Sequence, residues 1–506
     1  MIFRKVGPWY FWILVCAYAP AFVYSFAHHD QYRYFRVPAS EKTSCAEDSQ
    51  FYGLLFDLGR PVSALLECVQ FKLVNTLSDL TWCRLVMLGL ILTLAFLLSR
   101  IFHHRWGFGR ETAGLLAVSI CVLPGMLNFF VMASETAVVA LILGTLSFSI
   151  YDQRWKNQAI AFLLFLIGLF TYPAAAFVLI GLAFADCLFT NGPRREALRR
   201  LISINLLAVV GSILFFSAVK FVLHPYSDYD LRHPKGEGWG GATYAFSLST
   251  DLLGRLGFFV RAMGAVFNFW NLYTSVVVSS ILFAFLLFLV VRRFFIKSNQ
   301  DMKWKVAVAL IGFFATFAPV LFAGIQELLF RTLTSISAYA LLVLVWLYRE
   351  NFSVWPSMMR ITVAAVVILS SFNLFMTAQN SSLELGFLRS QIQERGLLNQ
   401  KVLLIKNLDR SQATKGFNGL PSVSDEFNVN STLYYDFENT WILRAALIEA
   451  GAPTSTHVVS CAGADDCVKA EAALRSMPNV YVISRGADFT GYPTLFPVID
   501  LAPFSN

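Results

Sequence analysis

Charged residues are scarce in this chain of 506 residues: Asp, Glu, Lys and Arg make up 14% of it, and hydrophobic residues make up 57%. A water-soluble chain of this length would carry far more charge, so the composition indicates a polytopic α-helical membrane protein. The formal net charge of +8 does not indicate nucleic-acid binding, because the arginines stand in short runs between apolar segments rather than on one basic face.

Three other features are missing. The first apolar stretch, residues 9–27, lacks a small-residue cleavage site and is expected to remain as a signal anchor. No two halves of the chain repeat each other. The cysteines lack the paired spacing of a metal site; the pairs Cys45 with Cys68 and Cys461 with Cys467 instead predict disulfides in an oxidising compartment.

The apolar segments predict about eleven membrane spans, since a helical crossing takes roughly 17–25 residues. Basic residues recur in every second connection, which places the N-terminus in the cytoplasm. The stretch 158–189 is predicted to be a hairpin with Tyr172-Pro173 at its outer tip, because a single helix would put the Arg194–Arg200 cluster outside. The expected spans are residues 9–27, 82–99, 112–131, 135–151, 158–171, 173–189, 202–223, 271–291, 305–324, 332–348 and 361–379.

Hydrophilic segments complete the predicted domain organisation. A transmembrane domain over residues 1–380 has two large outer loops, 28–81 and 224–268, and the first of these is expected to hold amphipathic helices on the membrane surface. Residues 381–506 have the composition of a small soluble α/β domain. Its predicted strands are residues 401–405, 457–459 and 480–483, and its predicted helices are 440–449 and 469–476.

Acidic, arginine and tyrosine residues gather at the predicted outer ends of the spans. Asp30 has an ordinary explanation as a solvated interfacial acid, Glu135 as a complement to a helix N-terminus, and Arg331 as an arginine that reaches lipid headgroups. Together the residues suit sugar transfer from a polyprenyl phosphate, in which a carboxylate accepts the proton of the attacking hydroxyl and arginines hold the lipid phosphate. The set is Asp30, Arg33, Asp57, Arg60, Glu135, Tyr172 and Arg331.

Two motifs in the first loop carry a family resemblance: His28-His29-Asp30-Gln31-Tyr32-Arg33 and Asp57-Leu58-Gly59-Arg60-Pro61. With Glu135 at the turn between the third and fourth spans, they resemble the bacterial type II (Gtr-type) O-antigen glucosyl transferases of the GT-C glycosyltransferase superfamily. The resemblance covers residues 1–380 loosely and leaves the C-terminal module without a counterpart. That family usually has two adjacent aspartates near the first span, where this chain has Asp30-Gln31, so Asp30 is the lone acid there.

The resemblance implies a GT-C-like membrane domain and a hexosyltransferase that inverts the anomeric carbon by direct displacement. The donor would be a polyprenyl-phosphate-linked sugar, glucose in that family. The acceptor would be lipopolysaccharide O-antigen or another lipid-linked glycan at the periplasmic face of the bacterial inner membrane. No cofactor is expected, with a divalent metal left open. The resemblance implies that Asp30 is the catalytic general base and that Asp57 or Glu135 is a second catalytic acid. The residues implied to bind substrate are Arg33, Arg60, Tyr172 and Arg331.

Other classes of protein stay open. A transporter or flippase for lipid-linked glycans would often have internal repeats and broken helices that meet at the middle of the membrane, whereas the charges here gather at one surface. A polysaccharide polymerase or ligase would share the donor chemistry but concentrate its arginines in one large outer loop. A structural assembly protein would need no acid–arginine set, so replacing Asp30 with alanine separates it from an enzyme.

Overall fold

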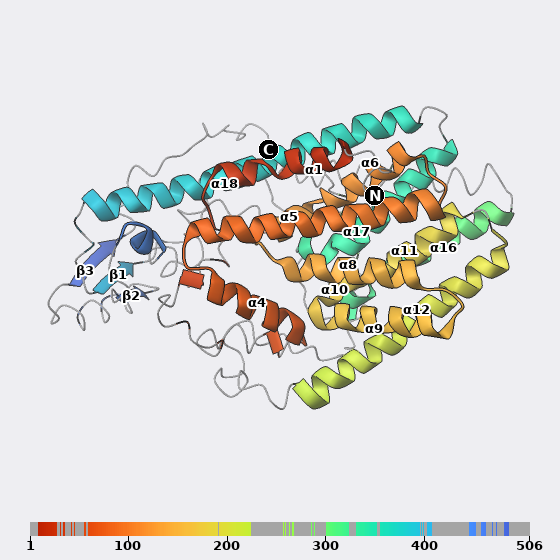
Figure 1. Ribbon diagram of the computed structural model, residues 1–506, viewed down its shortest axis with the longest axis horizontal. Coiled ribbons are helices and arrows are strands. Elements are labelled where there is room, and N and C mark those ends of the chain that lie inside the picture. Colours follow the sequence, from red (N-terminus) through yellow and green to blue (C-terminus); the bar gives the residue numbers. More distant parts are fainter. Residues whose placement is uncertain are drawn as a thin grey trace. The chain divides into compact units, whose positions relative to one another are not determined.

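The computed structural model describes residues 9–27, 59–190, 192–223, 300–322, 330–351, 355–394, 402–406, 445–451, 457–461 and 480–484, with isolated positions between these ranges. The described part is largely helical (Figure 1). Two compact units divide the chain. The first comprises Met1–Tyr18, Asp48–Val69 and Leu85–Ser371, and the second comprises Ala19–Glu47, Gln70–Arg84 and Phe372–Asn506.

Most of the described helices belong to the first unit. Three of them, α4 (Pro61–Leu73), α5 (Leu77–Arg100) and α18 (Trp355–Glu394), include residues of both units, and α2 (Pro20–Val23) belongs to the second. Those wholly within the first unit are α1 (Trp9–Tyr18), η5 (Ile101–Arg105), α6 (Arg110–Cys121), α7 (Pro124–Val131), α8 (Glu135–Ile150), α9 (Trp155–Thr171), α10 (Pro173–Ala176), α11 (Val178–Phe189), α12 (Arg194–Ala218), η6 (Val219–Leu223), α16 (Gln300–Phe322) and α17 (Phe330–Asn351).

Within the described part of the chain, three helical segments are long and apolar enough to cross a membrane: Leu77–Arg105, Arg194–Leu223 and Thr332–Arg349. A fourth results if α6 and α7, which meet at a bend of 57°, are one broken span. Shorter apolar helices cover most of the other predicted spans. Most of the predicted span 271–291 and most of the loop 224–268 lie outside the described residues.

Prolines interrupt two segments that the sequence analysis treats as continuous spans. Residues 9–27 contain α1 and α2, and α2 starts at Pro20. Residues 112–131 contain the bent pair α6 and α7, and Pro124 is the first residue of α7. Proline has no N–H to donate to the preceding helix, so α1 and α6 end ahead of Pro20 and Pro124. Leu123 before Pro124 has an extended backbone, whereas Ala19 before Pro20 keeps helical backbone angles. The pair α6 and α7 is together long and apolar enough to be one broken span, so the structure adds a bend within the predicted span 112–131.

The chain reverses direction at Tyr172-Pro173, as the predicted hairpin requires. Tyr151 lies in the short turn between α8 and α9, and Asp186 lies in the last turn of α11. Arg200 reaches both: its Nη2 donates to the Tyr151 carbonyl oxygen over 3.0 Å, and its Nε lies 3.8 Å from Asp186 Oδ2. The start of α9 and the end of α11 therefore lie at the same end of the unit, and Tyr172 lies at the other.

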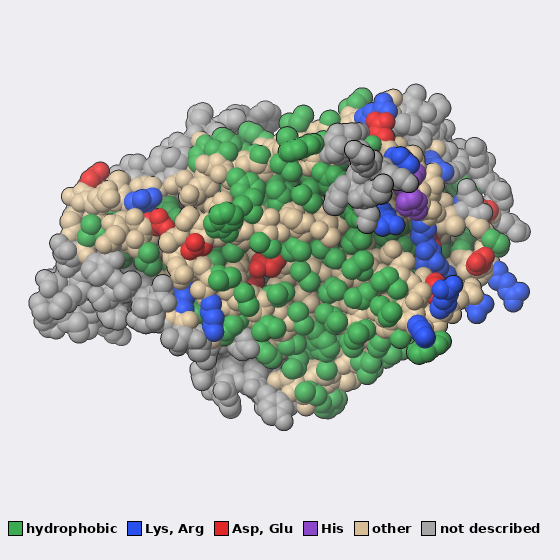
Figure 2. Space-filling view, in the orientation of Figure 1, with side chains coloured by type: hydrophobic (Ala, Val, Ile, Leu, Met, Phe, Trp, Pro, Cys, Tyr) green, Lys and Arg blue, Asp and Glu red, His purple; other side chains and the backbone are tan. Residues whose placement is uncertain are grey.

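Apolar side chains cover much of the outer surface of this unit. Ile160, Leu163 and Ile167 project from α9, and Ile202, Leu206, Val209 and Ile213 project from α12. Figure 2 shows hydrophobic side chains over the middle of the helical region, with Lys, Arg and His gathered toward one end. Exposed apolar surface on this scale is unusual for a monomeric soluble protein and is ordinary for helices in contact with lipid.

The second unit contains a small sheet of parallel strands in the order β2-β1-β3. The strands are β1 (Val402–Lys406), β2 (His457–Cys461) and β3 (Val480–Ser484), which coincide with the three predicted strands to within two residues. Val402 is opposite His457 on one side and Val480 on the other. Residues 445–449 are helical and stop at Gly451, whose φ of +87° suits a glycine helix end. The boundary at residue 380 stays a prediction.

The hydrophobic core of the second unit joins parts of the chain that are far apart in sequence. Tyr34 and Phe35 of the first loop pack with Phe71 and Val74 and with Ala445–Leu447 near the C-terminus. Leu385 and Ile392 of α18 are in the same core. They lie two turns apart on one face of the helix, which explains why α18 continues to Glu394 instead of ending near the predicted residue 379.

Cys45 and Cys68 are both disulfide-bonded, as predicted. Cys467 lies outside the described residues, so the pairing of Cys461 with Cys467 stays a prediction.

Candidate functional site

Arg60 lies against the ring of Tyr172, with its guanidinium carbon 4.4 Å from the ring centroid. The Tyr172 side chain is buried and Arg60 is half-buried. Next to this contact, Ser63 Oγ donates to the carbonyl oxygen of Thr171. The first turn of α4 is therefore fixed to the end of α9 at two adjacent points, and Arg60 is held at the tip of the hairpin.

The neighbours of Arg60 in the Gly59-Arg60-Pro61 motif have structural roles. Gly59 has a φ of +70°, and a Cβ there would lie 2.3 Å from Val219 Cγ2, so only glycine fits. Pro61 is the first residue of α4, where its missing N–H costs nothing. Glycine and proline thus shape the backbone at this turn, and they leave the guanidinium of Arg60 as the chemically active part of the motif.

Glu135 lies at the same end of the unit as Tyr172. It is the first residue of α8, which packs along α9 and is joined to it by a short turn, so the two helices run in opposite directions (Figure 1). The start of α8 therefore lies beside the end of α9. The preceding helix contributes Phe129, whose ring meets that of Tyr172 edge to face at 5.6 Å. Glu135 and the Arg60–Tyr172 pair thus belong to one region of the structure.

The turn before Glu135 has an unusual backbone. Ala133 has a φ of +44°, a conformation that residues with a side chain seldom adopt. The Ser134 N–H donates to the Phe129 carbonyl oxygen over 2.9 Å, which closes the end of α7 around Ala133. Glu135 then enters the first turn of α8, where the helix dipole stabilises its carboxylate. The position of Glu135 in the first turn of α8 agrees with its expected role as a complement to a helix N-terminus. The same position leaves its carboxylate at the Tyr172 end of the unit.

Arg331 lies in the first turn of α17, four residues before Ser335. Ser335 Oγ donates to the Ala174 carbonyl oxygen over 2.7 Å, and Ala174 lies two residues after Tyr172. The start of α17 is therefore at the same end of the first unit as the hairpin tip. Four of the predicted residues, Arg60, Glu135, Tyr172 and Arg331, lie at this end. The other three, Asp30, Arg33 and Asp57, lie outside the described residues.

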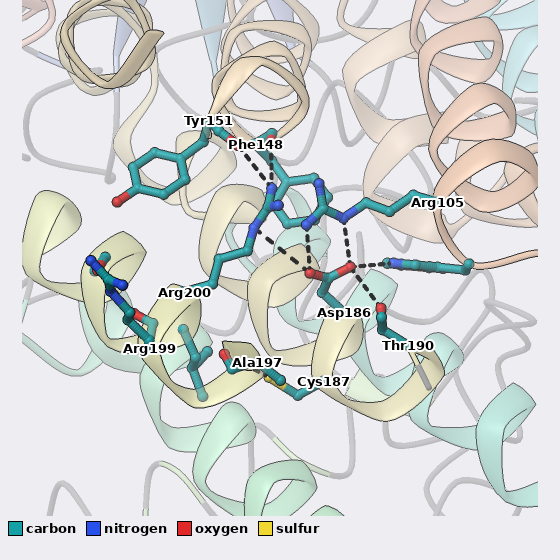
Figure 3. Close-up of polar contacts among 12 residues, drawn as sticks. Arg105, Phe148, Tyr151, Asp186, Cys187, Thr190, Ala197, Arg199 and Arg200 are labelled. Carbon is teal, nitrogen blue, oxygen red and sulfur yellow. Dashed lines mark hydrogen bonds and ion pairs between the residues drawn. The ribbon is translucent and has the colours of Figure 1, made fainter. Parts of the chain in front are cut away.

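The opposite end of the unit contains a polar cluster around Asp186 that the sequence analysis did not identify (Figure 3). Arg105 donates twice to the Asp186 carboxylate, over 2.6 and 2.8 Å, and Trp106 Nε1 donates over 2.9 Å. Arg200 approaches the second carboxylate oxygen, and its guanidinium also lies over Phe148. The available signal was a lone acid in the apolar run 173–189, since such residues usually have a partner.

The two ends differ in their chemistry. Asp186 is buried and paired with Arg105 and Arg200, which are half-buried. The turn before α9 and the first turns of α9 and α12, at the same end, carry exposed basic residues: Arg154, Lys156, Arg194, Arg195 and Arg199. The Arg60 end offers a half-buried guanidinium, an aromatic face and a carboxylate, which together suit a phosphate and a hydroxyl-bearing substrate. Among the described residues, no three His, Cys, Asp or Glu side chains come together as metal ligands.

Comparison of the chain with protein-family models, with curated proteins and with solved structures found no match.

Proposed function

We propose that this protein is a membrane glycosyltransferase of the GT-C type that moves a single hexose, glucose by resemblance, from a polyprenyl-phosphate donor to a glycan acceptor. The acceptor is lipopolysaccharide O-antigen or another lipid-linked glycan at the periplasmic face of the bacterial inner membrane. Its transmembrane domain crosses the membrane about eleven times. The observation that carries the proposal is the Arg60–Tyr172 pair, which shares one end of the helices with Glu135.

Arg60 suits the donor phosphate. Guanidinium binds phosphate through parallel hydrogen bonds, and a half-buried site strengthens them because less water competes. In the proposed reaction Arg60 and Arg331 hold the phosphate and stabilise its charge as the sugar leaves. Asp30 accepts the proton of the attacking hydroxyl, and Glu135 or Asp57 positions the acceptor.

The distribution of basic residues supports a periplasmic site. Exposed Arg and Lys surround the Asp186 end, whereas the Arg60 end lies across the helices from them. Cytoplasmic connections carry the excess of Lys and Arg in inner-membrane proteins, so the Asp186 end is assigned to the cytoplasm. Nucleotide sugars are confined to the cytoplasm, and a lipid-linked donor therefore fits a site on the other side.

Reporter fusions test this orientation. Alkaline phosphatase is active only when exported, so we expect no activity from fusions after Arg100, Arg200 and Arg293, and activity from fusions after Ser247 and Gly396. Phosphatase activity after Arg200 would invert the second half of the topology and contradict the assigned location of the site.

Glycan analysis of a host with and without the protein tests the reaction itself, and the Arg60 variants test the site. Charged hydrogen bonds contribute about 1.5–3 kcal/mol, so Arg60→Ala should weaken donor use by roughly 10- to 100-fold. Arg60→Lys should be milder, because it keeps the charge and loses only the paired hydrogen bonds. The matched control is Arg199→Ala, which removes an exposed arginine at the opposite end. If Arg60→Ala weakened the use of the donor and the use of the acceptor equally, Arg60 would not be the residue that binds the donor phosphate.

One observation favours a flippase of lipid-linked glycans as the second candidate. The 57° bend between α6 and α7 resembles the broken helices of transporters. Reconstituted vesicles distinguish the two: a flippase moves the lipid-linked sugar across the bilayer without an acceptor, and a transferase changes the acceptor glycan.

A further inference from the structure

Arg84 is a fully buried arginine in a helix that is otherwise apolar around it. It is the only charged residue in the predicted span 82–99, near the outer end of that span, and its exposed fraction is 0%. Burying a guanidinium is costly unless its hydrogen bonds are satisfied, and charged residues within membrane helices usually have a function.

The described partners of Arg84 lie on both sides of Asp30 in the chain. Its Nη2 donates to the Phe26 carbonyl oxygen over 3.0 Å and to Gln31 Oε1 over 3.2 Å. Its guanidinium carbon also lies 3.7 Å from the centroid of the Phe26 ring. One side chain of α5 thus contacts Phe26, near the end of the first apolar segment, and Gln31, the residue that immediately follows Asp30.

Two further hydrogen bonds join described residues of the first loop to Gln70 and Val74. Tyr34 OH donates to Gln70 Oε1 over 2.9 Å, and Lys42 Nζ donates to the Val74 carbonyl oxygen. All of these residues belong to the second unit. Among these polar contacts, only those of Arg84 flank Asp30.

We propose that Arg84, through its hydrogen bonds to Phe26 and Gln31, is a positioning residue for the Asp30 general base. This inference rests on the proposed function. Catalysis by a general base depends on its placement, and a displacement of about 1 Å can cost about 10²-fold in rate. The Arg84 guanidinium donates to two acceptors and also lies over the Phe26 ring, and the compact ammonium of lysine reproduces this combination only in part.

The test combines kinetics with amide hydrogen exchange on the full-length protein in detergent or vesicles. Arg84→Gln should lower kcat per folded molecule by about 10²-fold with little change in the donor KM, and Arg84→Lys should recover about tenfold of that loss. In an Asp30→Asn background, Arg84→Gln should lower kcat by less than about twofold, because the effects of two substitutions on one functional unit do not add. Exchange in residues 27–33 should be faster in Arg84→Gln.

Gln31→Met provides a second variant that leaves Arg84 in place and removes one of its acceptors; a smaller loss of kcat is expected. Tyr34→Phe is the matched control, since it removes a different contact of the same loop and should leave kcat unchanged. Unchanged kcat and unchanged exchange in Arg84→Gln would overturn the inference, and so would a full 10²-fold loss in the Asp30→Asn background. If the wild-type protein transfers no sugar, the proposed function fails, whereas the exchange rates still decide whether Arg84 holds the segment.

Discussion

Sugar transfer is expected to fall by about 10²–10⁴-fold when Asp30 is replaced by asparagine, because the amide keeps the shape of the side chain and cannot accept a proton. The protein should still insert and accumulate normally. The measurement is the initial rate of acceptor modification per folded molecule, with a polyprenyl-phosphate-linked sugar as the donor.

Asp79→Asn is the matched control for this prediction. It is the same substitution in the same predicted loop, but Asp79 has a structural role: its carboxylate accepts hydrogen bonds from the N–H groups of Asn75 and Thr76, both over 2.8 Å, at the start of α5. We expect this variant to lose stability and to keep its rate. Full glycan modification by Asp30→Asn would remove Asp30 from the mechanism, and Asp57 or Glu135 would become the next candidate.

Asp186→Asn should destabilise the protein by about 3–5 kcal/mol, the usual cost of removing one partner of a buried ion pair. The Asp186 carboxylate accepts hydrogen bonds from Arg105, Trp106 and Thr190, and it also neutralises Arg200. Without the negative charge of Asp186, Arg105 and Arg200 lie close together with no carboxylate between them, at the end of the first unit opposite Tyr172. Thermal unfolding in detergent measures the change.

Glu111→Gln is the corresponding control, because Glu111 pairs with Arg360 over 2.9 Å on an exposed surface. Exposed pairs contribute about 0.2–1 kcal/mol, so this variant should unfold near the wild-type temperature. Equal effects of the two substitutions would mean that the Asp186 cluster does not hold the helix ends together.

The candidate site was predictable only in part. Arg60, Glu135, Tyr172 and Arg331 were identified from their positions at span ends, and the structure brings them to one end of the first unit. The contact of Arg60 with Tyr172 was not predictable, because more than a hundred residues separate them and only the packing of α4 against α9 joins them. Arg84 and Asp186 were overlooked because a single charge in an apolar run does not identify its partner.

The sequence by itself determined the local features of this protein. Apolar run lengths indicated the membrane helices, short apolar runs indicated the three strands, and Tyr172-Pro173 marked the reversal between α9 and α11. These features depend on propensities and on proline chemistry, which act over a few residues.

Only the tertiary structure decided which distant segments meet. It extended α18 to Glu394, and it joined Tyr34 with Phe71 and Ala446 in one core. It also placed Arg84 against Phe26 and Gln31, and Asp186 against Arg105 and Arg200. Buried charges take their partners from whichever segment packs beside them, and that packing depends on the whole chain rather than on neighbouring residues.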